Sequence, residues 1–228
     1  MSTAPFKAPA RPVLPTTRDG VHLEPHRIFC IGKNYADHVR EMGGDPSKQD
    51  PVLFSKPVSA IIPDGETISY PPMTEDLHYE GELVLVLESG GADISEADAL
   101  DHVWGYACGN DLTRRDLQAL SKTGGHPWDM AKGFDRSAVI GPMVPKDEVS
   151  LDDARLSLTV NGVEKQGAPL TSMIWSVPAI IACLSRYVTL EPGDVIFTGT
   201  PEGVGPLVPG DTCTVAIDGL PSCTVAIA

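Results

Sequence analysis

The sequence has little positive charge, few aromatic residues and no long apolar run. It carries 17 lysines and arginines against 31 aspartates and glutamates, a formal net charge of −14. This balance argues against nucleic acid or an anionic membrane surface as the main partner. No stretch reaches the length of a membrane-spanning helix, and the N-terminal 20 residues lack the apolar segment of a secretory signal. We therefore expect a cytoplasmic protein that binds neither nucleic acid nor membranes.

Cysteines in metal-binding or disulfide patterns are also missing. The chain has five cysteines, an odd number, and no CxxC pair. Each lies in an apolar stretch, which predicts buried, reduced thiols in place of a zinc site or a disulfide framework.

Turn-forming residues are plentiful, with 22 glycines and 21 prolines. A chain of 228 residues suits one domain. Residues 1–20, rich in Pro, Thr and Ala, predict a flexible N-terminal arm, and residues 21–228 a single domain. Strand-like runs predominate, and helices do not alternate with them as a doubly wound sheet requires. The sequence thus predicts a mixed, β-dominated (α+β) fold, rolled or barrel-like, with a few short helices.

Several local elements can be placed. We expect a helix over 34–42 with Asn34 as N-cap, a capped helix over 92–100, a helix from Asp111 onward, and a helix with an early proline within 172–187. Asn161-Gly162 and Asp218-Gly219 predict hairpin turns.

Two carboxylates interrupt the apolar stretch LHYEGELVLVL, residues 77–87. Side chains alternate across a strand, so Glu80 and Glu82 share a face, which Val84 and Val86 continue as a buried surface. Two carboxylates there would repel each other and resist burial unless a divalent cation neutralised them. An edge strand with two exposed acids is the alternative, and these two residues alone do not decide between them.

A third carboxylate favours the metal site. Asp111 follows the apolar strand VWGYAC and precedes a predicted helix, although an aspartate there is also an ordinary N-cap. Three carboxylates make an all-oxygen site, which suits Mg²⁺, Mn²⁺ or Ca²⁺ better than Zn²⁺. His78 has ligand-like spacing, but a supporting role is the better interpretation.

The motifs together resemble a known family. HYEGEL, GNDLTRRDLQ, AKGFD and FTGTPEGVGP occur in the order found in the fumarylacetoacetate hydrolase family, and IGKNYADHVREMG is similar to its compact acylpyruvase and fumarylpyruvate hydrolase branch. The resemblance implies a β-roll-like fold, a homodimer, and one divalent cation per subunit, Mg²⁺ or Mn²⁺, held by Glu80, Glu82 and Asp111. Gly81 departs from the pattern, because family members usually have a bulky apolar residue between the two glutamates.

The resemblance also implies catalytic roles. His38 and Glu41, spaced i, i+3, match the family's water-activating dyad, whereas the spacing alone favours an exposed helix pair. Lys132 is implied as the cation that faces the enolate or the substrate carboxylate. Arg115, Gln118 and Thr200 are expected to bind substrate, with Thr200 beside a glycine-rich turn whose amides are free to bind a carboxylate. Lys33 and Lys56 are interpreted as structural.

The leading hypothesis is therefore a metal-dependent hydrolase that cleaves the C–C bond of an acylpyruvate, most simply fumarylpyruvate to fumarate and pyruvate. The substrate is a small 2-oxo acid, and a cation would stabilise the departing enolate. A decarboxylase or tautomerase acting on oxaloacetate or a related dioic acid is the first alternative. A non-catalytic protein that retains the fold is the second.

Overall fold

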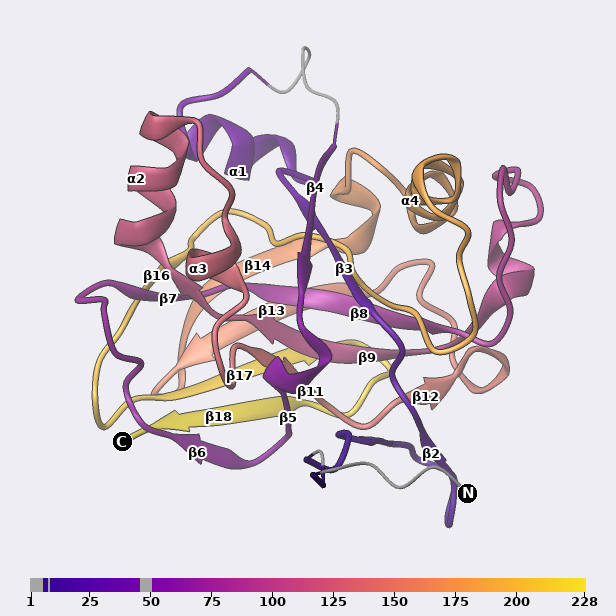
Figure 1. The fold of residues 1–228 in the computed structure, drawn as a ribbon, viewed down its shortest axis with the longest axis horizontal. Helices are drawn as coiled ribbons and strands as arrows, with labels where there is room; N and C mark the ends of the chain where they lie inside the picture. The colour runs from indigo at the N-terminus through magenta and orange to yellow at the C-terminus, as the bar shows by residue number, and fades with distance from the viewer. Residues whose placement is uncertain (1–5, 8, 46–50) are drawn as a thin grey trace.

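The structure, a computed structural model, describes residues 6, 7, 9–45 and 51–228, and strands dominate them (Figure 1). The helices gather in the upper half of the view. Within the described residues they are α1 (Ala36–Glu41), α2 (Arg115–Gly124), α3 (Asp129–Lys132) and α4 (Val177–Tyr187). Short 3-10 helices cover Val58–Ala60, Ala99–His102, Lys146–Glu148 and Leu170–Ser172. The β-dominated mixed fold predicted from the sequence is confirmed.

The largest sheet has eight strands. Its order is β4 (Val52–Lys56), β3 (Ile28–Gly32), β15 (Val195–Phe197), β8 (Gly81–Leu87), β9 (Val103–Asp111), β11 (Ala138–Ile140) and β5 (Ile61–Pro63), and β12 (Val144–Pro145) also pairs with β9. The pairs β15–β3 and β11–β5 are parallel, and the other pairs are antiparallel.

A second sheet packs against the first. Its order is β14 (Val163–Pro169), β13 (Arg155–Val160), β17 (Thr212–Ile217), β18 (Cys223–Ile227) and β6 (Glu66–Ile68). Two smaller sheets complete the described strands. One joins β10 (Thr113–Arg114), β7 (Leu77–Tyr79) and β16 (Gly205–Leu207), and the other joins β1 (Leu14–Pro15) and β2 (His22–Leu23).

The core follows from the alternation of side chains along β8. Leu83 points into the cluster between the two large sheets, where it meets Leu158 of β13. Leu85 belongs to a second hydrophobic cluster, which lies beneath α4. Val84 belongs to a third hydrophobic cluster on the main sheet. Because β8 is buried along its whole length, a carboxylate within it is surrounded by protein. All five cysteines are buried and free, as predicted.

Several local predictions are confirmed. Asn161 and Gly162 both have positive φ, 52° and 78°, as a type I′ turn between β13 and β14 requires. Ser176 caps α4 by accepting a hydrogen bond from the Ala179 amide at 3.4 Å, and a proline stands in the first turn.

Three helix predictions were wrong in detail. The helix expected from Asp111 begins at Arg115, because Asp111 is the last residue of β9. Helix α1 begins at Ala36, and the Asn34 side chain does not cap it; it donates instead to the carbonyls of Trp175 and Thr198. Over 92–100 the only helical residues belong to the 3-10 segment Ala99–His102. There the Ser95 hydroxyl bonds the Asp98 side chain and amide, and this local turn competes with a helix.

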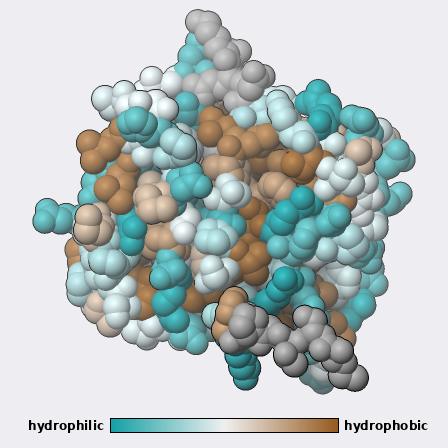
Figure 2. Space-filling model, in the orientation of Figure 1, coloured by the Kyte–Doolittle hydropathy of each residue, from teal (hydrophilic) through white to brown (hydrophobic). Residues whose placement is uncertain are grey.

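The predicted division into an arm and one domain stays a prediction. Within the stretch called an arm, the described residues include β1, whose Leu14 is fully buried, and Thr17 donates to the Met143 carbonyl at 3.0 Å. No helix among the described residues is both long and apolar enough to cross a bilayer. Apolar side chains reach the surface among the polar ones in Figure 2, and Leu120 of α2 and Met130 of α3 are 68% and 70% exposed.

Candidate active site

The site begins where the strand through LHYEGELVLVL breaks. Strand β7 ends at Tyr79 and β8 starts at Gly81, so Glu80 lies between them. The Glu80 amide donates to the Asn110 side chain at 2.9 Å, while its carbonyl accepts from the Asp111 amide at 2.9 Å. The Asn110 side chain thus takes the place of a backbone acceptor in the β-sheet hydrogen-bond pattern, and Glu80 is held next to the end of β9.

Three carboxylates converge at this break. Oxygen atoms of Glu80, Glu82 and Asp111 all lie within 4.8 Å of one another, and all three residues are buried. The predicted carboxylate cluster is therefore present, and the alternative of an exposed edge strand was wrong.

Cations surround this cluster. Lys132, at the end of α3, places Nζ 2.7 Å from both Glu80 Oε2 and Asp111 Oδ2. Arg115, in the first turn of α2, donates to the other Glu80 oxygen. Lys56 of β4 lies 2.7 Å from Asp111 Oδ1. Among the described residues, three cations thus balance three carboxylates.

The charges have opposite effects on the two glutamates. Burial pushes the pKa of Glu80 upward, but the charges of Lys132 and Arg115 outweigh it and hold that pKa below its ordinary value. Burial, followed by the charges of Asp111 and Glu80, raises the pKa of Glu82 well above its ordinary value. Glu82 is thus the carboxylate that the surrounding protein neutralises least.

These residues fit a divalent cation. Asp111 Oδ1 is buried and, although close to Lys56, lacks an aligned hydrogen bond from any described residue. One carboxylate oxygen of Glu82 accepts a hydrogen bond from the Gly199 amide at 2.7 Å. An all-oxygen set that includes one poorly compensated carboxylate suits a hard cation such as Mg²⁺ or Mn²⁺.

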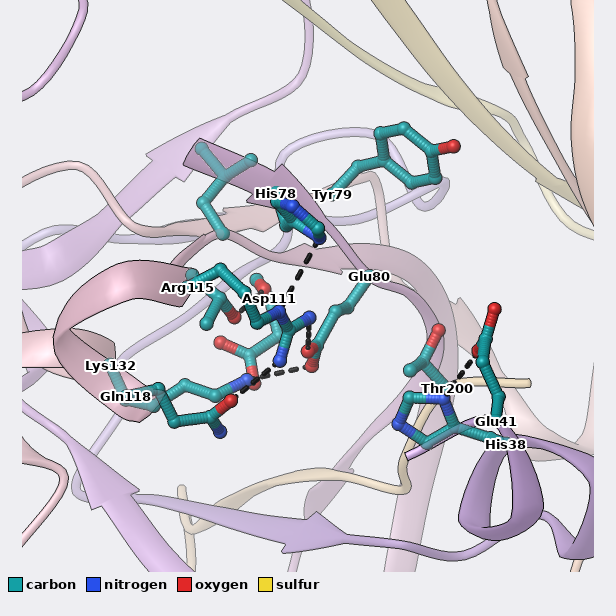
Figure 3. Close-up of polar contacts among 12 residues, drawn as sticks. His38, Glu41, His78, Tyr79, Glu80, Asp111, Arg115, Gln118, Lys132 and Thr200 are labelled. Atoms are coloured by element: carbon teal, nitrogen blue, oxygen red, sulfur yellow. Dashed lines mark hydrogen bonds and ion pairs between the residues drawn. The ribbon is translucent and has the colours of Figure 1, made fainter. Parts of the chain in front are cut away.

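The predicted dyad lies on the other side of Glu80 from Arg115 (Figure 3). His38 Nδ1 is 3.2 Å from Glu41 Oε2, and His38 is only 5% exposed. The Gly203 amide donates to both Glu41 oxygens at 3.2 Å, which holds the carboxylate in place. His38 therefore faces inward and lines the same pocket as Glu80 and Glu82.

The predicted substrate residues line this pocket as well. Arg115, Gln118 and Thr200 belong to its wall, together with Lys132. Arg115 donates to Gln118 Oε1 at 2.6 Å, so the two side chains are held as a pair. His78 is not part of the carboxylate cluster; it lies 3.4 Å from Arg115 Nε and 2.9 Å from Asp76, in agreement with a supporting role.

The glycine-rich turn after β15 differs from expectation. The amides of this turn were predicted to be free for a carboxylate, but the Gly199 amide donates to Glu82 and the Gly203 amide donates to Glu41. The Thr200 hydroxyl donates to the Gly81 carbonyl at 2.9 Å and accepts from Gln166 at 2.8 Å. The turn therefore positions the site's own carboxylates.

Sequence reasoning missed Gln166 and understated Lys56. Gln166 Oε1 accepts from the Gly81 amide at 2.9 Å, while its Nε2 donates to Thr200 and to the Pro201 carbonyl, so it ties β8 to the glycine-rich turn. A glutamine in the middle of the hairpin VEKQG carries no signal of such a role. Lys56 ends the strand VLFSK directly after a serine, and that local sequence does not indicate that its side chain is buried against Asp111.

The structure explains why position 81 is a glycine. A Cβ on Gly81 would lie 3.1 Å from Leu158 Cδ1 and 3.4 Å from Gln166 Oε1. A bulky residue between the two glutamates would therefore displace the core side chain or the amide that supports Thr200. In this chain, a glycine at position 81 leaves the space that the Leu158 and Gln166 side chains occupy.

Comparison with known proteins places this fold and site in a family. Residues 27–228 match the family described as fumarylacetoacetate (FAA) hydrolase, C-terminal. The chain belongs to the fumarylacetoacetate hydrolase family, as the motifs indicated, and is an enzyme of that family.

Relatives within the family have more than one activity. The chain is 45% identical over 196 residues to the mitochondrial oxaloacetate tautomerase of Mus musculus, covering 86% of this chain and 88% of that protein. It is 42% identical to the crystal structure of fumarylpyruvate hydrolase from Pseudomonas aeruginosa in complex with Mn²⁺ and pyruvate, with a TM-score of 0.97 over 99% of each chain. It is also 38% identical to 2-hydroxyhepta-2,4-diene-1,7-dioate isomerase from Mycobacterium marinum, with a TM-score of 0.79 over 90% of this chain and 75% of that one.

Proposed function

We propose that this protein hydrolyses the C–C bond of an acylpyruvate, with fumarylpyruvate as substrate and fumarate and pyruvate as products. The observation that carries the proposal is the meeting, in one pocket, of a carboxylate cluster, the buried cation Lys132 and an inward-facing His38–Glu41 pair. The close match to a fumarylpyruvate hydrolase over 99% of both chains supports this choice of substrate.

The carboxylates of Glu80, Glu82 and Asp111 would hold one divalent cation per subunit, Mg²⁺ or Mn²⁺. Such a cation supplies Lewis-acid stabilisation of negative charge that develops on the 2-oxo acid part of the substrate.

Lys132 orients the 2-oxo acid end of the substrate in this proposal. Its Nζ already bridges Glu80 and Asp111, so its position is fixed by two charge-assisted hydrogen bonds. The third N–H of the ammonium is available to a substrate oxygen at the pocket. That donor would favour the enolate more strongly than the ketone, because the enolate oxygen carries the greater negative charge.

The dyad supplies the base. His38 removes a proton from a water molecule while Glu41 stabilises the imidazolium that forms. The hydroxide adds to the C4 carbonyl, the C3–C4 bond breaks, and its electron pair passes to C3 to give the pyruvate enolate. A proton returned to C3 completes pyruvate, and the acyl part leaves as fumarate. Water is consumed once and no oxidant is needed.

Arg115 and Gln118 would position the substrate on the α2 side of the pocket, and Thr200 on the side of the glycine-rich turn. The Thr200 hydroxyl is engaged with Gly81 and Gln166, so its contribution to the substrate would be as a fixed wall and an acceptor.

Pyruvate release tests the proposal. Purified protein given fumarylpyruvate with Mg²⁺ or Mn²⁺ should release pyruvate, and a chelator should abolish it. Glu80→Gln should lose the activity by roughly two orders of magnitude or more, as removal of oriented electrostatic groups commonly does. Turnover that survives both the chelator and Glu80→Gln would refute the role of the carboxylates.

A second candidate, tautomerisation or decarboxylation of oxaloacetate, is favoured by the 45% identity to an oxaloacetate tautomerase. Neither reaction needs hydroxide to add to a carbonyl. His38→Ala should therefore abolish fumarylpyruvate hydrolysis, whereas a decarboxylase that relies on Lys132 would retain activity on oxaloacetate. If the wild type turned over oxaloacetate but not fumarylpyruvate, this second candidate would be the function.

The remaining sequence-based expectations are also proposals: a cytoplasmic homodimer that binds neither nucleic acid nor membranes. Light scattering coupled to size exclusion gives the mass in solution, and a mass near that of a 24.2 kDa monomer would overturn the dimer.

A further inference from the structure

Two lysines at the pocket are not used by the mechanism. Lys33 and Lys122 line the same pocket as Glu80, Arg115 and Lys132. The chain as a whole carries a charge of −14, yet four cationic side chains line this one cavity. The acidic residues of this cavity wall, Glu80 and Glu82, are buried and engaged with Lys132, Arg115 and the Gly199 amide.

An aromatic ring connects the two lysines. Lys122, in the last turn of α2, places Nζ 5.3 Å from the centre of the Trp128 ring. The same ring is 3.6 Å from the position that a Cβ on Gly32 would take, and Lys33 is the next residue. Lys33 has a φ of 63°, a conformation uncommon for a lysine. The end of β3 and the last turn of α2 thus both lie against the Trp128 ring, and the lysine that follows β3 lines the same pocket as the lysine of α2.

Neither lysine has an anionic partner in the described part of the chain. The Lys122 ammonium lies against the face of the Trp128 ring. Partial burial and then the charge of Arg115 lower the pKa of Lys122 to about 8; Lys33 and Lys132 act in the same direction and Glu80 opposes them. Like charges gathered without a partner are stabilised by a bound anion.

We propose that Lys33 and Lys122 bind the distal carboxylate of the substrate, so that the enzyme selects dioxo acids with a second carboxylate over neutral acylpyruvates. This inference rests on the proposed function, because it assumes that the 2-oxo acid end lies at Lys132. The acyl part then points away from the buried carboxylates, toward the side of the pocket that the two lysines line.

The chemistry suits this assignment. An ammonium at a rim binds a carboxylate by charge and by up to three N–H donors without requiring a fixed geometry. The flat Trp128 and Phe54 rings, 5.7 Å apart, offer an apolar wall for an unsaturated acyl chain between the two ends. A substrate with a methyl group at that end would leave both ammonium groups without a partner.

A matched pair of substrates tests the proposal. Fumarylpyruvate and crotonylpyruvate differ by a carboxylate against a methyl group at the distal end. Lys33→Met and Lys122→Met should each lower kcat/KM for fumarylpyruvate roughly 10-fold, the loss of one hydrogen bond to a charged group, and leave crotonylpyruvate within about 2-fold. Lys122→Arg should retain most of the preference, and Lys7→Met, at an exposed residue of the N-terminal stretch, serves as the control.

Parallel losses on both substrates, or no loss on either, would overturn the proposal. Calorimetry that measures the affinity for fumarate distinguishes a failure of this inference from a failure of the proposed function. If the wild type cleaves neither acylpyruvate, the proposed function fails, yet weaker fumarate binding by the two lysine variants would still support the carboxylate site. Fumarate affinity that is unchanged in both variants would count against it.

Discussion

Replacing Lys56 with methionine should destabilise the protein more than any other single lysine substitution outside the pocket. The Lys56 side chain is fully buried, and its Nζ lies 2.7 Å from Asp111 Oδ1. The three N–H groups of the ammonium also lie within hydrogen-bonding distance of the Ser137 hydroxyl and carbonyl (2.9 and 3.0 Å), the Leu112 carbonyl (3.2 Å) and the Lys132 carbonyl. Methionine fills nearly the same volume and removes only the charge and the donors.

The magnitude follows from what stays behind. Removing one partner of a buried ion pair commonly lowers the free energy of unfolding by about 3–5 kcal/mol. Asp111 keeps the Lys132 ammonium 2.7 Å from its Oδ2, so the loss should lie in the lower part of that range. The carbonyl of Ser137 keeps a bond from the Leu112 amide, and the Lys132 carbonyl keeps one from the Ser137 hydroxyl, so orphaned acceptors add little. Burial already lowers the pKa of Lys56, which shows that desolvation of the ammonium offsets part of its benefit. We therefore expect a loss of about 3–4 kcal/mol.

Urea unfolding followed by linear extrapolation measures this loss. Lys146→Met is the matched control. Lys146 also contacts one carboxylate, that of Glu88 at 3.3 Å, and two carbonyls, but its side chain is 34% exposed. Its removal should cost less than about 1 kcal/mol, as for other surface pairs. Equal losses for the two variants, or a loss below about 1 kcal/mol for Lys56→Met, would refute the reasoning that burial sets the magnitude.

Three further predictions concern the site. Glu82→Gln keeps an acceptor for Gly199 but removes a charge, so the rise in melting temperature on adding Mn²⁺ should disappear; an undiminished rise would exclude Glu82 as a ligand. Gly81→Ala should lower the free energy of unfolding by about 1–3 kcal/mol, because the new Cβ lies 3.1 Å from Leu158 Cδ1, and an unchanged denaturation midpoint would show that Leu158 moves freely. Lys122 is charged below its pKa of about 8 and neutral above it, so KM for fumarylpyruvate should rise above about pH 8 in the wild type and stay flat in Lys122→Arg.

The sequence was informative where a residue type is rare in its surroundings. Carboxylates in an apolar stretch have few explanations, so Glu80 and Glu82 could be predicted to share one face of a strand from their spacing, and Asp111 then favoured a metal site. Asn161-Gly162 and the Ser-Val-Pro start of α4 are local signals, and their turn and cap depend on neighbours in the chain. These elements were predicted because short-range chemistry determines them.

Contacts between distant segments could not be predicted in this way. Gln166 bridges Gly81 and Thr200, which are 85 and 34 residues away in the chain, and nothing in its own neighbourhood indicates either partner. The glycine-rich turn was read as an open anion site for the same reason. Its amides are indeed oriented toward carboxylates, but those of Glu82 and Glu41, which the fold brings from β8 and α1.

The carboxylates and the cations of the site compensate each other's charge. Glu80, Glu82 and Asp111 are balanced by Lys56, Lys132 and Arg115, so the site as described is close to neutral. A divalent cation would add two positive charges to this buried region. The 2-oxo acid end of the substrate carries two negative charges, one on its carboxylate and one on the oxygen of the forming enolate, and would restore the balance. Cation and substrate should therefore bind more tightly together than apart, and by the same factor in each order of addition. The same balance explains why so many lysines and arginines of a strongly acidic chain are found around one pocket: they compensate carboxylates that are buried to hold a cation, and the surplus at the rim is left for the substrate.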